Sequence, residues 1–185
     1  GWVRLFETSP AFPVVVIPDA RKFLGAIANI VYGRASERIN VLGVTGTNGK
    51  TTTATMIEAA LLANGRSTGF IGTTGIRIGA HEMPSKRTTP EATTLHGLFA
   101  QMGEQSVTDV VMEVSSHALS EDRVGGLNYS VVGFTNLSQD HLDYHHTMEE
   151  YFQAKALLFT PKYAGQAVIC IDDAWGERLA ALATV

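Results

Sequence analysis

The segment that most constrains this chain runs from Gly43 to Thr53 and reads GVTGTNGKTTT. The apolar run 39–44 that leads into it has the composition of a strand. The pattern over 51–64, closed by Gly65, is helical. A strand, a glycine-containing loop, a Lys-Thr pair and a helix are the layout of a phosphate-binding loop. Such a loop directs backbone N–H groups and a helix N-terminus at the anionic oxygens of a nucleotide. We therefore predict nucleotide binding here.

Four residues of this loop have expected roles. Gly46 and Gly49 let the backbone turn tightly and approach a phosphate without a Cβ in the way. Lys50 would reach the terminal phosphates, and the Thr51 hydroxyl would meet a magnesium ion. The general pattern G-x-x-x-x-G-K-[ST] has a glycine where this chain has Val44. By that pattern alone, an ordinary glycine-rich turn that caps a helix is the alternative.

Composition favours a cytoplasmic enzyme, which we expect to be a monomer. The chain has 185 residues, 45% of them hydrophobic, and a net charge of −4, so it lacks the basic footprint of a nucleic-acid-binding protein. No apolar run reaches the roughly 18 residues of a membrane span, and no signal peptide is visible. The single Cys170 cannot form an internal disulfide. Because the chain starts without Met and stops just after a helix-like segment, we expect a piece of a longer protein.

Strands and helices alternate along the chain. Apolar strands are expected over 12–17, 39–44, 67–73, 108–114, 129–135 and 167–171, with a hairpin-like excursion over 76–82. Helices are expected over 19–32, 51–64, 89–102, 147–159 and 173–183. This alternation predicts an α/β fold with a mostly parallel sheet and helices on both faces. Ligands of such sheets bind beyond the carboxyl ends of the strands, so the loops that follow Val44, Thr73, Val114 and Thr135 would share one rim.

Three local features refine this picture. The apolar face of the first helix predicts packing on the core; its members are Phe23, Leu24, Ile27, Ile30 and Val31. The polar segment 33–38 reads as a linker, which gives two domains, 1–37 and 38–185. Thr89 is a candidate N-cap for the third helix, with Pro90 in its first turn.

Two candidate metal positions follow strands. Glu113 ends an apolar strand and could join Thr51 in holding magnesium, although Asp172 is an alternative by the same argument. His141, with a carboxylate on either side, could bind a second metal; a structural or solvated histidine is the alternative. Glu113 and His141 lie where the predicted rim would gather ligands.

Lys155 falls on the apolar face of its predicted helix, together with Tyr151, Phe152, Leu158 and Phe159. Burying an ammonium costs several kcal/mol unless the group is paired or neutralised. The lysine therefore either extends to water along its aliphatic stem or has a depressed pKa that lets it react or be modified.

The same rim carries neutral and cationic donors, namely Thr88, Thr89, Ser115 and Arg123. Donors of this kind suit a substrate with phosphate or carboxylate groups. The alternative is that the first three are helix caps and that Arg123 is a surface charge.

Taken together, these segments resemble the Mur ligases of bacterial cell-wall synthesis, and most of all the MurE type, the UDP-N-acetylmuramoyl-tripeptide synthetases. The matching segments are TGTNGKTT at 45–52, TTPE at 88–91, EVSSHAL at 113–119, NLSQDHLD at 136–143 and YFQAK at 151–155. The first is shared with folylpolyglutamate synthases, whereas the third and fourth are more specific. The phosphate loop of this family lacks the first glycine, which removes the objection at Val44.

The resemblance implies a P-loop-containing Mur ligase central domain and an ATP-dependent amide ligase of peptidoglycan biosynthesis. The enzyme would add the third amino acid to UDP-N-acetylmuramoyl-L-alanyl-D-glutamate through an acyl phosphate, with ATP and Mg²⁺ as cofactors. Its partners would be this muramoyl dipeptide and an amino acid. Another Mur-type or folylpolyglutamate-type ligase, or a P-loop regulatory protein, is the alternative. A guanine-specific switch would need an Asn-Lys-x-Asp segment, which the chain lacks.

The resemblance also implies residue roles. The ATP phosphates would be bound by Gly46, Thr47, Asn48, Gly49, Lys50, Thr51 and Thr52. Thr51 and Glu113 would hold the first magnesium, which favours Glu113 over Asp172, and His141 would hold the second. Lys155 matches the lysine that this family carbamylates to support that metal. The muramoyl dipeptide would meet Thr88, Thr89, Ser115 and Arg123.

Two further points follow from the resemblance. Glu121 stands where some relatives have a glutamine on the substrate, so that contact departs from the family pattern. The family has three domains, and this chain would contain only the tail of the first, within 1–37, and most of the second, within 38–185. We therefore expect the chain alone to be unable to complete the ligation.

Overall fold

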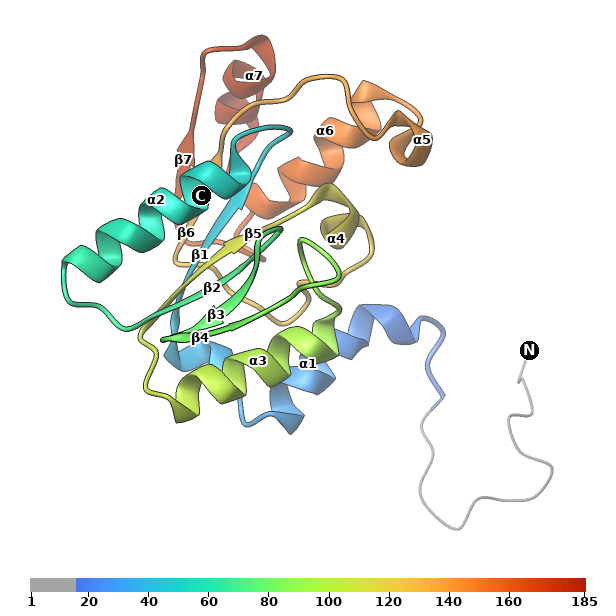
Figure 1. The fold of residues 1–185 in the computed structure, drawn as a ribbon. Helices are drawn as coiled ribbons and strands as arrows, with labels where there is room; N and C mark the ends of the chain where they lie inside the picture. The colour runs from blue at the N-terminus through green and yellow to red at the C-terminus, as the bar shows by residue number, and fades with distance from the viewer. Residues whose placement is uncertain (1–15) are drawn as a thin grey trace.

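A seven-stranded sheet forms the centre of the computed structural model, which describes residues 16–185 (Figure 1). Its strands lie in the order β4-β3-β2-β5-β1-β6-β7. They are β1 Asn40–Thr45, β2 Thr68–Gly72, β3 Gly75–Ile78, β4 His81–Met83, β5 Asp109–Glu113, β6 Val131–Phe134 and β7 Ala167–Ile169. Strands β2, β5, β1, β6 and β7 are parallel, and β3 and β4 add an antiparallel edge. The predicted α/β fold with a mostly parallel sheet is confirmed.

Helices cover both faces of the sheet. They are α1 Ala20–Val31, α2 Lys50–Ala63, α3 Ala92–Glu104, α4 Ser116–Ser120, α5 Leu142–His145, α6 Met148–Ala156 and α7 Ala174–Leu182. Two 3₁₀ turns, η1 Ala35–Arg38 and η2 Leu157–Phe159, complete the described elements. Figure 1 shows α2 on one side of the sheet and the α1–α3 pair on the other. No helix within 16–185 is both long and apolar enough to cross a membrane.

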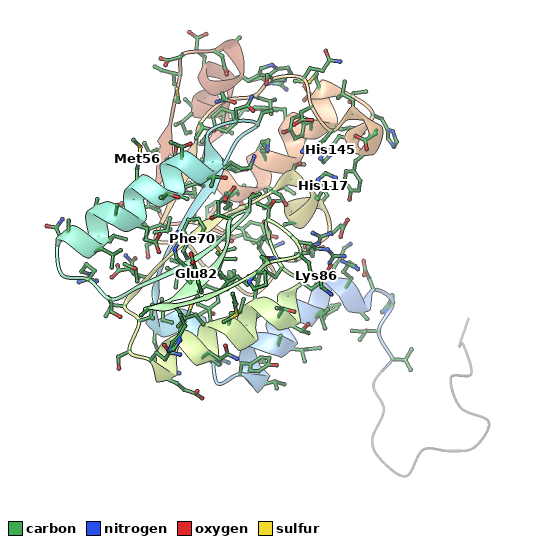
Figure 2. The ribbon with its side chains drawn as sticks, in the orientation of Figure 1. Met56, Phe70, Glu82, Lys86, His117 and His145 are labelled. Atoms are coloured by element: carbon green, nitrogen blue, oxygen red, sulfur yellow. The ribbon has the colours of Figure 1, made fainter. Side chains whose placement is uncertain are left out.

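Alternating side chains of β5 divide the interior into two layers. Val110 and Met112 belong to the larger layer, while Val111 belongs to the layer under α2 with Ala54 and Phe70. Successive side chains of a strand point to opposite faces, and here both faces are covered. This double burial explains why the strands are apolar throughout. On the outer side of α2, Met56 is 68% exposed (Figure 2).

The expectation that the apolar face of α1 packs on the core is wrong. Phe23 and Ile27 are each 50% exposed and Val31 is 73% exposed, whereas the small Gly25 and Ala28 are buried. The helix comes so close to its neighbour that a Cβ on Gly25 would lie 2.0 Å from the carbonyl oxygen of Gly125. A residue without a side chain permits this approach, so the buried face is the small one and not the more hydrophobic one.

Two further expectations are corrected, and a third lies mostly outside the described residues. The 33–38 segment is not an open linker, because Ala35 and Ser36 are buried and the Ser36 hydroxyl donates to Asn29 Oδ1 at 3.1 Å. Thr89 does not cap α3, whose N-cap is Glu91. The strand expected over 12–17 lies mostly outside the described residues, and its last two residues are not in a strand.

We predict opposite effects for the same substitution at two helical glycines. Gly25→Ala should lower the free energy of unfolding by about 1–3 kcal/mol, because the new methyl meets the Gly125 backbone. Gly103→Ala in α3 should raise it by about 0.5–1 kcal/mol, since nothing lies within 4 Å of the added Cβ and alanine favours helix. Urea unfolding measures both. Equal stability of the two variants would contradict the close packing of α1.

Candidate functional site

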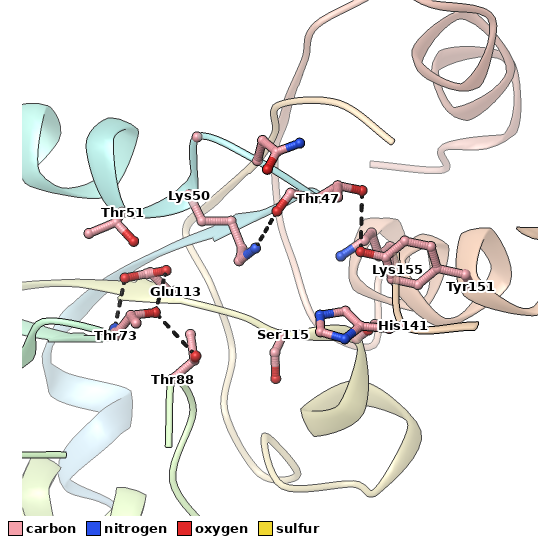
Figure 3. A pocket seen from close by; sticks show the side chains of 13 residues that line it. Thr47, Lys50, Thr51, Thr73, Thr88, Glu113, Ser115, His141, Tyr151 and Lys155 are labelled. Atoms are coloured by element: carbon pink, nitrogen blue, oxygen red, sulfur yellow. Dashed lines mark hydrogen bonds between the residues drawn. The ribbon is translucent and has the colours of Figure 1, made fainter. Parts of the chain in front are cut away.

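A half-open pocket of about 270 Å³ lies at the carboxyl ends of the parallel strands (Figure 3). It is lined by Thr47, Asn48, Gly49, Lys50, Thr51, Thr73, Thr88, Glu113, Ser115, Ser116, His141, Tyr151 and Lys155. These residues come from the loops after β1, β2, β4, β5 and β6, from the end of β5, and from α2, α4 and α6. The expected shared rim is therefore present, and most residues singled out in the sequence meet there.

The glycine loop between β1 and α2 has the backbone of a phosphate cradle. Gly46 and Gly49 have φ of 147° and 82°, values that favour glycine. A Cβ on Gly46 would also lie 1.9 Å from Thr135 Oγ1. The loop after β6 holds the cradle from outside: Asn48 N donates to Asn136 Oδ1 at 3.0 Å, and Thr135 Oγ1 donates to Asn48 O at 2.7 Å. The N-terminus of α2 is thereby aimed into the pocket.

Lys50 folds back over its own loop. Its Nζ donates to the carbonyl oxygens of Gly46 at 3.0 Å and Thr47 at 2.8 Å. Burial lowers the pKa of this lysine, although the nearby charges of Glu113 and Asp140 act in the opposite direction. The cation is thus held at the mouth of the cradle, beside the position that phosphate oxygens would take.

Glu113 is fully buried at the end of β5. Its carboxylate accepts from the backbone N of Thr73 at 2.9 Å and from Thr73 Oγ1 at 3.2 Å. Within the described chain, no cationic side chain forms an ion pair with it. Figure 3 shows the side chains of Thr51 and Glu113 directed into the pocket. The alternative, Asp172, does not line it.

The oxygen-rich corner at Thr51 and Glu113 suits a hard cation. Magnesium prefers oxygen ligands and commonly takes one or two carboxylates together with phosphate and water oxygens. Across residues 16–185, no group of three or more His, Cys, Asp or Glu side chains could hold a metal ion. A magnesium ion here would therefore depend on the oxygens of a bound nucleotide.

Lys155 lies in the interior and does not extend to water. It is 1% exposed, its Nζ donates to Gly46 O at 2.8 Å, and it lies 4.6 Å from the ring centroid of Tyr151. Burial, helped by the charge of Lys50, lowers the pKa of Lys155 to about 7, while Asp140 acts in the opposite direction. At neutral pH a large share of this side chain is therefore the nucleophilic free amine.

His141 begins α5 in the left-handed conformation, with φ of 53°. Its side chain is 46% exposed, and its Nε2 lies 3.6 Å from Asp140 Oδ2. Its ring meets that of His117 edge to face, with centroids 4.9 Å apart. The imidazole is thus placed on the pocket wall opposite Glu113, where it remains accessible to a ligand (Figure 3).

Some of the remaining predicted residues line the pocket, and others lie behind its wall. Thr88 and Ser115 line it, but Gly46, Thr52, Thr89 and Arg123 do not. The Thr89 hydroxyl donates to Glu113 O at 2.9 Å and accepts from Ser115 N at 3.0 Å, so Thr89 supports the wall from behind. Arg123 is neither an open donor nor a free surface charge, because its side chain is 11% exposed and pairs with Glu91 and Glu121.

Sequence reasoning gave no site role to three residues that shape this pocket. Thr73 binds Glu113, and the Tyr151 hydroxyl lies 3.2 Å from Thr47 Oγ1, which joins α6 to the cradle. His145 is buried with Nε2 2.8 Å from Ser116 Oγ, and burial with the cations around it lowers its pKa to about 4. It lies close to His117 (Figure 2). Of these three residues, only Tyr151 could have been found from the sequence, because it lies on the same face of the predicted helix as Lys155.

Comparisons with known proteins agree on one family. The family model described as "Mur ligase middle domain" matches residues 44–185. The UDP-N-acetylmuramoyl-L-alanyl-D-glutamate–2,6-diaminopimelate ligase of Corynebacterium glutamicum is 53% identical over 99% of this chain and 36% of its own length. The enzyme of the same name from Aquifex aeolicus is 49% identical over 92% of this chain and 36% of its own length. This chain therefore spans about a third of the length of these relatives.

Solved structures show the same fold. A ligase structure of that same name superposes with a TM-score of 0.78 at 33% identity, covering 90% of this chain and 34% of the other. E. coli FolC, in complex with DHPP and ADP, superposes with a TM-score of 0.65 at 21% identity, covering 91% and 45%. The second similarity concerns the fold alone.

We predict that Lys155 titrates near neutral pH. In trace labelling with acetic anhydride, which reacts with the neutral amine, modification of Lys155 should rise from pH 5.5 and level off above a midpoint near its pKa of about 7. Lys162 is the control, because its hydrogen bond to Tyr163 raises its pKa and its labelling should still be rising at pH 9. Peptide mass spectrometry measures both. Labelling of Lys155 that parallels Lys162 would contradict the lowered pKa.

Proposed function

This chain belongs to the Mur ligase family, and we propose that it forms the nucleotide-binding part of an ATP-dependent, ADP-forming ligase. The proposed reaction adds the third amino acid to UDP-N-acetylmuramoyl-L-alanyl-D-glutamate in peptidoglycan synthesis. The names of the two relatives support 2,6-diaminopimelate as that amino acid. One observation carries the proposal: the phosphate cradle, the buried Glu113 and the buried Lys155 meet in one pocket.

The chemistry brings together two anions that repel each other, the γ-phosphate of ATP and the substrate carboxylate. A carboxylate oxygen attacks the γ-phosphorus and ADP leaves, which gives an acyl phosphate. The amine of the incoming amino acid then attacks the acyl carbon and phosphate leaves. Alignment and charge neutralisation are what such a reaction requires of the protein. Lys50 would exchange its two loop carbonyls for oxygens of the transferred phosphoryl group.

The phosphate loop would hold the nucleotide through its backbone. The N–H groups of Gly49, Thr51 and Thr52 lie at the N-terminus of α2, where anions are favoured, whereas those of Thr47 and Asn48 donate to Asn136. Thr135 and Asn136 hold this conformation through their hydrogen bonds to Asn48. The cradle is therefore preorganised, so little ordering entropy remains to be lost on binding.

The residues present fit a magnesium ion. Thr51 and Glu113 would hold it together with phosphate oxygens, because Glu113 is a buried carboxylate whose hydrogen-bond donors are neutral. When bound, the ion would withdraw negative charge from the phosphoryl group. His141 would help to hold a second ion on the opposite wall of the pocket.

Lys155 fits carbamylation. The neutral amine attacks CO₂, a C–N bond forms and one proton leaves, so a buried cation becomes a buried anion. The low pKa of about 7 supplies the neutral amine that this step needs. As a carbamate, the side chain would keep one N–H on Nζ, which now donates to Gly46 O, and would offer oxygens to the metal beside His141.

The acceptor side of the pocket would bind the muramoyl dipeptide. Thr88 and Ser115 line that side, and Thr89 orients Ser115 through its backbone N–H. Arg123 lies behind Thr89 and would contribute positive charge to this wall.

We retain the division into a domain tail at 1–37 and an ATP-binding domain at 38–185 as part of the proposal. We also propose a monomeric, cytoplasmic enzyme.

We predict that MgATP binding to this chain depends on Lys50. Lys50→Ala should weaken binding roughly 10- to 100-fold, because charge-assisted hydrogen bonds to the phosphates are lost. Lys86→Ala is the control: it removes the same charge from a residue that lines a different pocket, and binding should be unchanged. Isothermal titration calorimetry measures both. Equal affinity of Lys50→Ala and wild type would exclude the loop as the nucleotide site.

We predict substrate-dependent ADP release by the intact protein that carries this chain. ADP should form with UDP-N-acetylmuramoyl-L-alanyl-D-glutamate, ATP, magnesium and diaminopimelate. It should not form when UDP-N-acetylmuramoyl-L-alanine or a folate replaces the dipeptide precursor, because these acceptors lack the correctly placed carboxylate. A coupled ADP assay with mass spectrometry of the product measures this. Preference for the folate would instead assign a folylpolyglutamate-type ligase.

A further inference from the structure

Three side chains on the pocket wall are joined by consecutive hydrogen bonds (Figure 3). Thr73 lies in the turn between β2 and β3, Thr88 in the loop between β4 and α3, and Glu113 at the end of β5. Thr73 Oγ1 lies 3.2 Å from Glu113 Oε2 and 3.1 Å from Thr88 Oγ1. We call Thr88, Thr73 and Glu113 the threonine relay. It connects the carboxylate on the metal side of the pocket to a hydroxyl on the acceptor side.

The direction of the hydrogen bonds in the relay is set by Glu113. An ionised carboxylate can only accept, so the Thr73 hydroxyl donates to Glu113. A hydroxyl group has one proton, and Thr73 therefore has none left for Thr88. It follows that Thr88 donates to Thr73. Both hydroxyl protons thus point toward the carboxylate, and hydrogen bonds aligned in this way strengthen one another.

Other contacts leave the buried carboxylate of Glu113 little room to rotate. Thr73 N donates to its Oε1 at 2.9 Å, and a Cβ on Gly72 would lie 2.3 Å from the same oxygen. The Thr89 hydroxyl donates to the backbone carbonyl of Glu113 at 2.9 Å. The adjacent residues Thr88 and Thr89 therefore hold Glu113 at both ends, one through the relay and the other through the backbone.

We propose that Thr73 and Thr88 are positioning residues that hold Glu113 in the orientation required for binding a magnesium–nucleotide complex. This inference rests on the proposed function, because it takes magnesium and the ATP phosphates to meet at Glu113. Hydrogen bonds to a metal-binding carboxylate orient it, and their loss lowers metal affinity by about 10- to 100-fold. Thr88 would then act on the metal side of the pocket even when no acceptor substrate is bound.

The first test compares ATP binding to the 185-residue chain in magnesium and in EDTA, with no acceptor substrate present. The ratio of the two Kd values is the gain in affinity that magnesium provides. Isothermal titration calorimetry should show this gain reduced about tenfold in T73V and about threefold in T88V, because valine keeps the shape of threonine without the hydroxyl. Binding in EDTA should stay within about twofold, since Glu113 then has no metal to hold.

Two further variants and one background serve as controls. T73S should restore the gain, because serine keeps the hydroxyl. T74V should match wild type, since Thr74 is the next residue of the same turn, is exposed and does not line the pocket. In an E113Q background T73V should cause no further loss, because Thr73 acts through Glu113. An unchanged gain in T73V, or an equal loss in T74V or in the E113Q background, would overturn the proposal.

A second measurement separates failure of the relay from failure of the proposed function. Hydrogen exchange of the Thr73 amide is followed by NMR without nucleotide or metal. T88V leaves Thr73 itself unchanged, yet exchange should become about three- to tenfold faster, because the carboxylate that accepts from this amide is held less firmly. T74V should leave it unchanged. Equal exchange in wild type and T88V would overturn the relay, whereas wild-type ATP binding that magnesium does not improve would overturn the proposed metal site.

Discussion

The parallel pairing of β1 with β5 is the constraint on which the rest of the site depends. In this register Val44 lies opposite Glu113, so the strand that enters the phosphate cradle and the strand that ends in the buried carboxylate finish at the same level. A shift of one residue would turn Glu113 to the other face of the sheet, because side chains alternate along a strand. The pairing of β1 with β5 therefore sets how close Glu113 lies to Lys50 and Thr51. The loops that follow the strands complete the site.

A second consequence of this arrangement is competition for one carbonyl group. Gly46 O accepts from Lys50 at 3.0 Å and from Lys155 at 2.8 Å. Burial lowers the pKa of both lysines, and the charge of Lys50 lowers the pKa of Lys155 further. A phosphate would draw Lys50 away, and conversion of Lys155 to an anion would remove the repulsion. Phosphate binding and carbamylation would therefore each reduce the repulsion between the two lysines.

A feature of the structure could be predicted from the sequence when the residues that create it lie close together in the chain. The cradle was predictable because strand, loop and helix are contiguous. Helical periodicity placed Lys155 on the apolar face of its helix but did not decide whether its side chain stays in the interior or extends to water. The face by which α1 packs could not be predicted, because the contact of Gly25 with Gly125 joins residues far apart in the chain. The same limit explains Thr89: its sequence context suggests a helix cap, but its hydroxyl is used by Glu113 and Ser115. Roles that arise from tertiary contacts leave little local signal.

The close packing of α1 also bears on the ion pairs around Arg123. Exposed ion pairs contribute little by themselves, so the pairs of Arg21 with Glu91 and Glu121, each at 3.6 Å, would not hold a helix in place. The contact between Gly25 and Gly125 can, because it brings two backbones together, and Gly125 is two residues from Arg123. The position of α1 therefore determines where Arg21 stands relative to Glu91 and Glu121. Whatever shifts α1 moves Arg21 relative to the two carboxylates that also pair with Arg123.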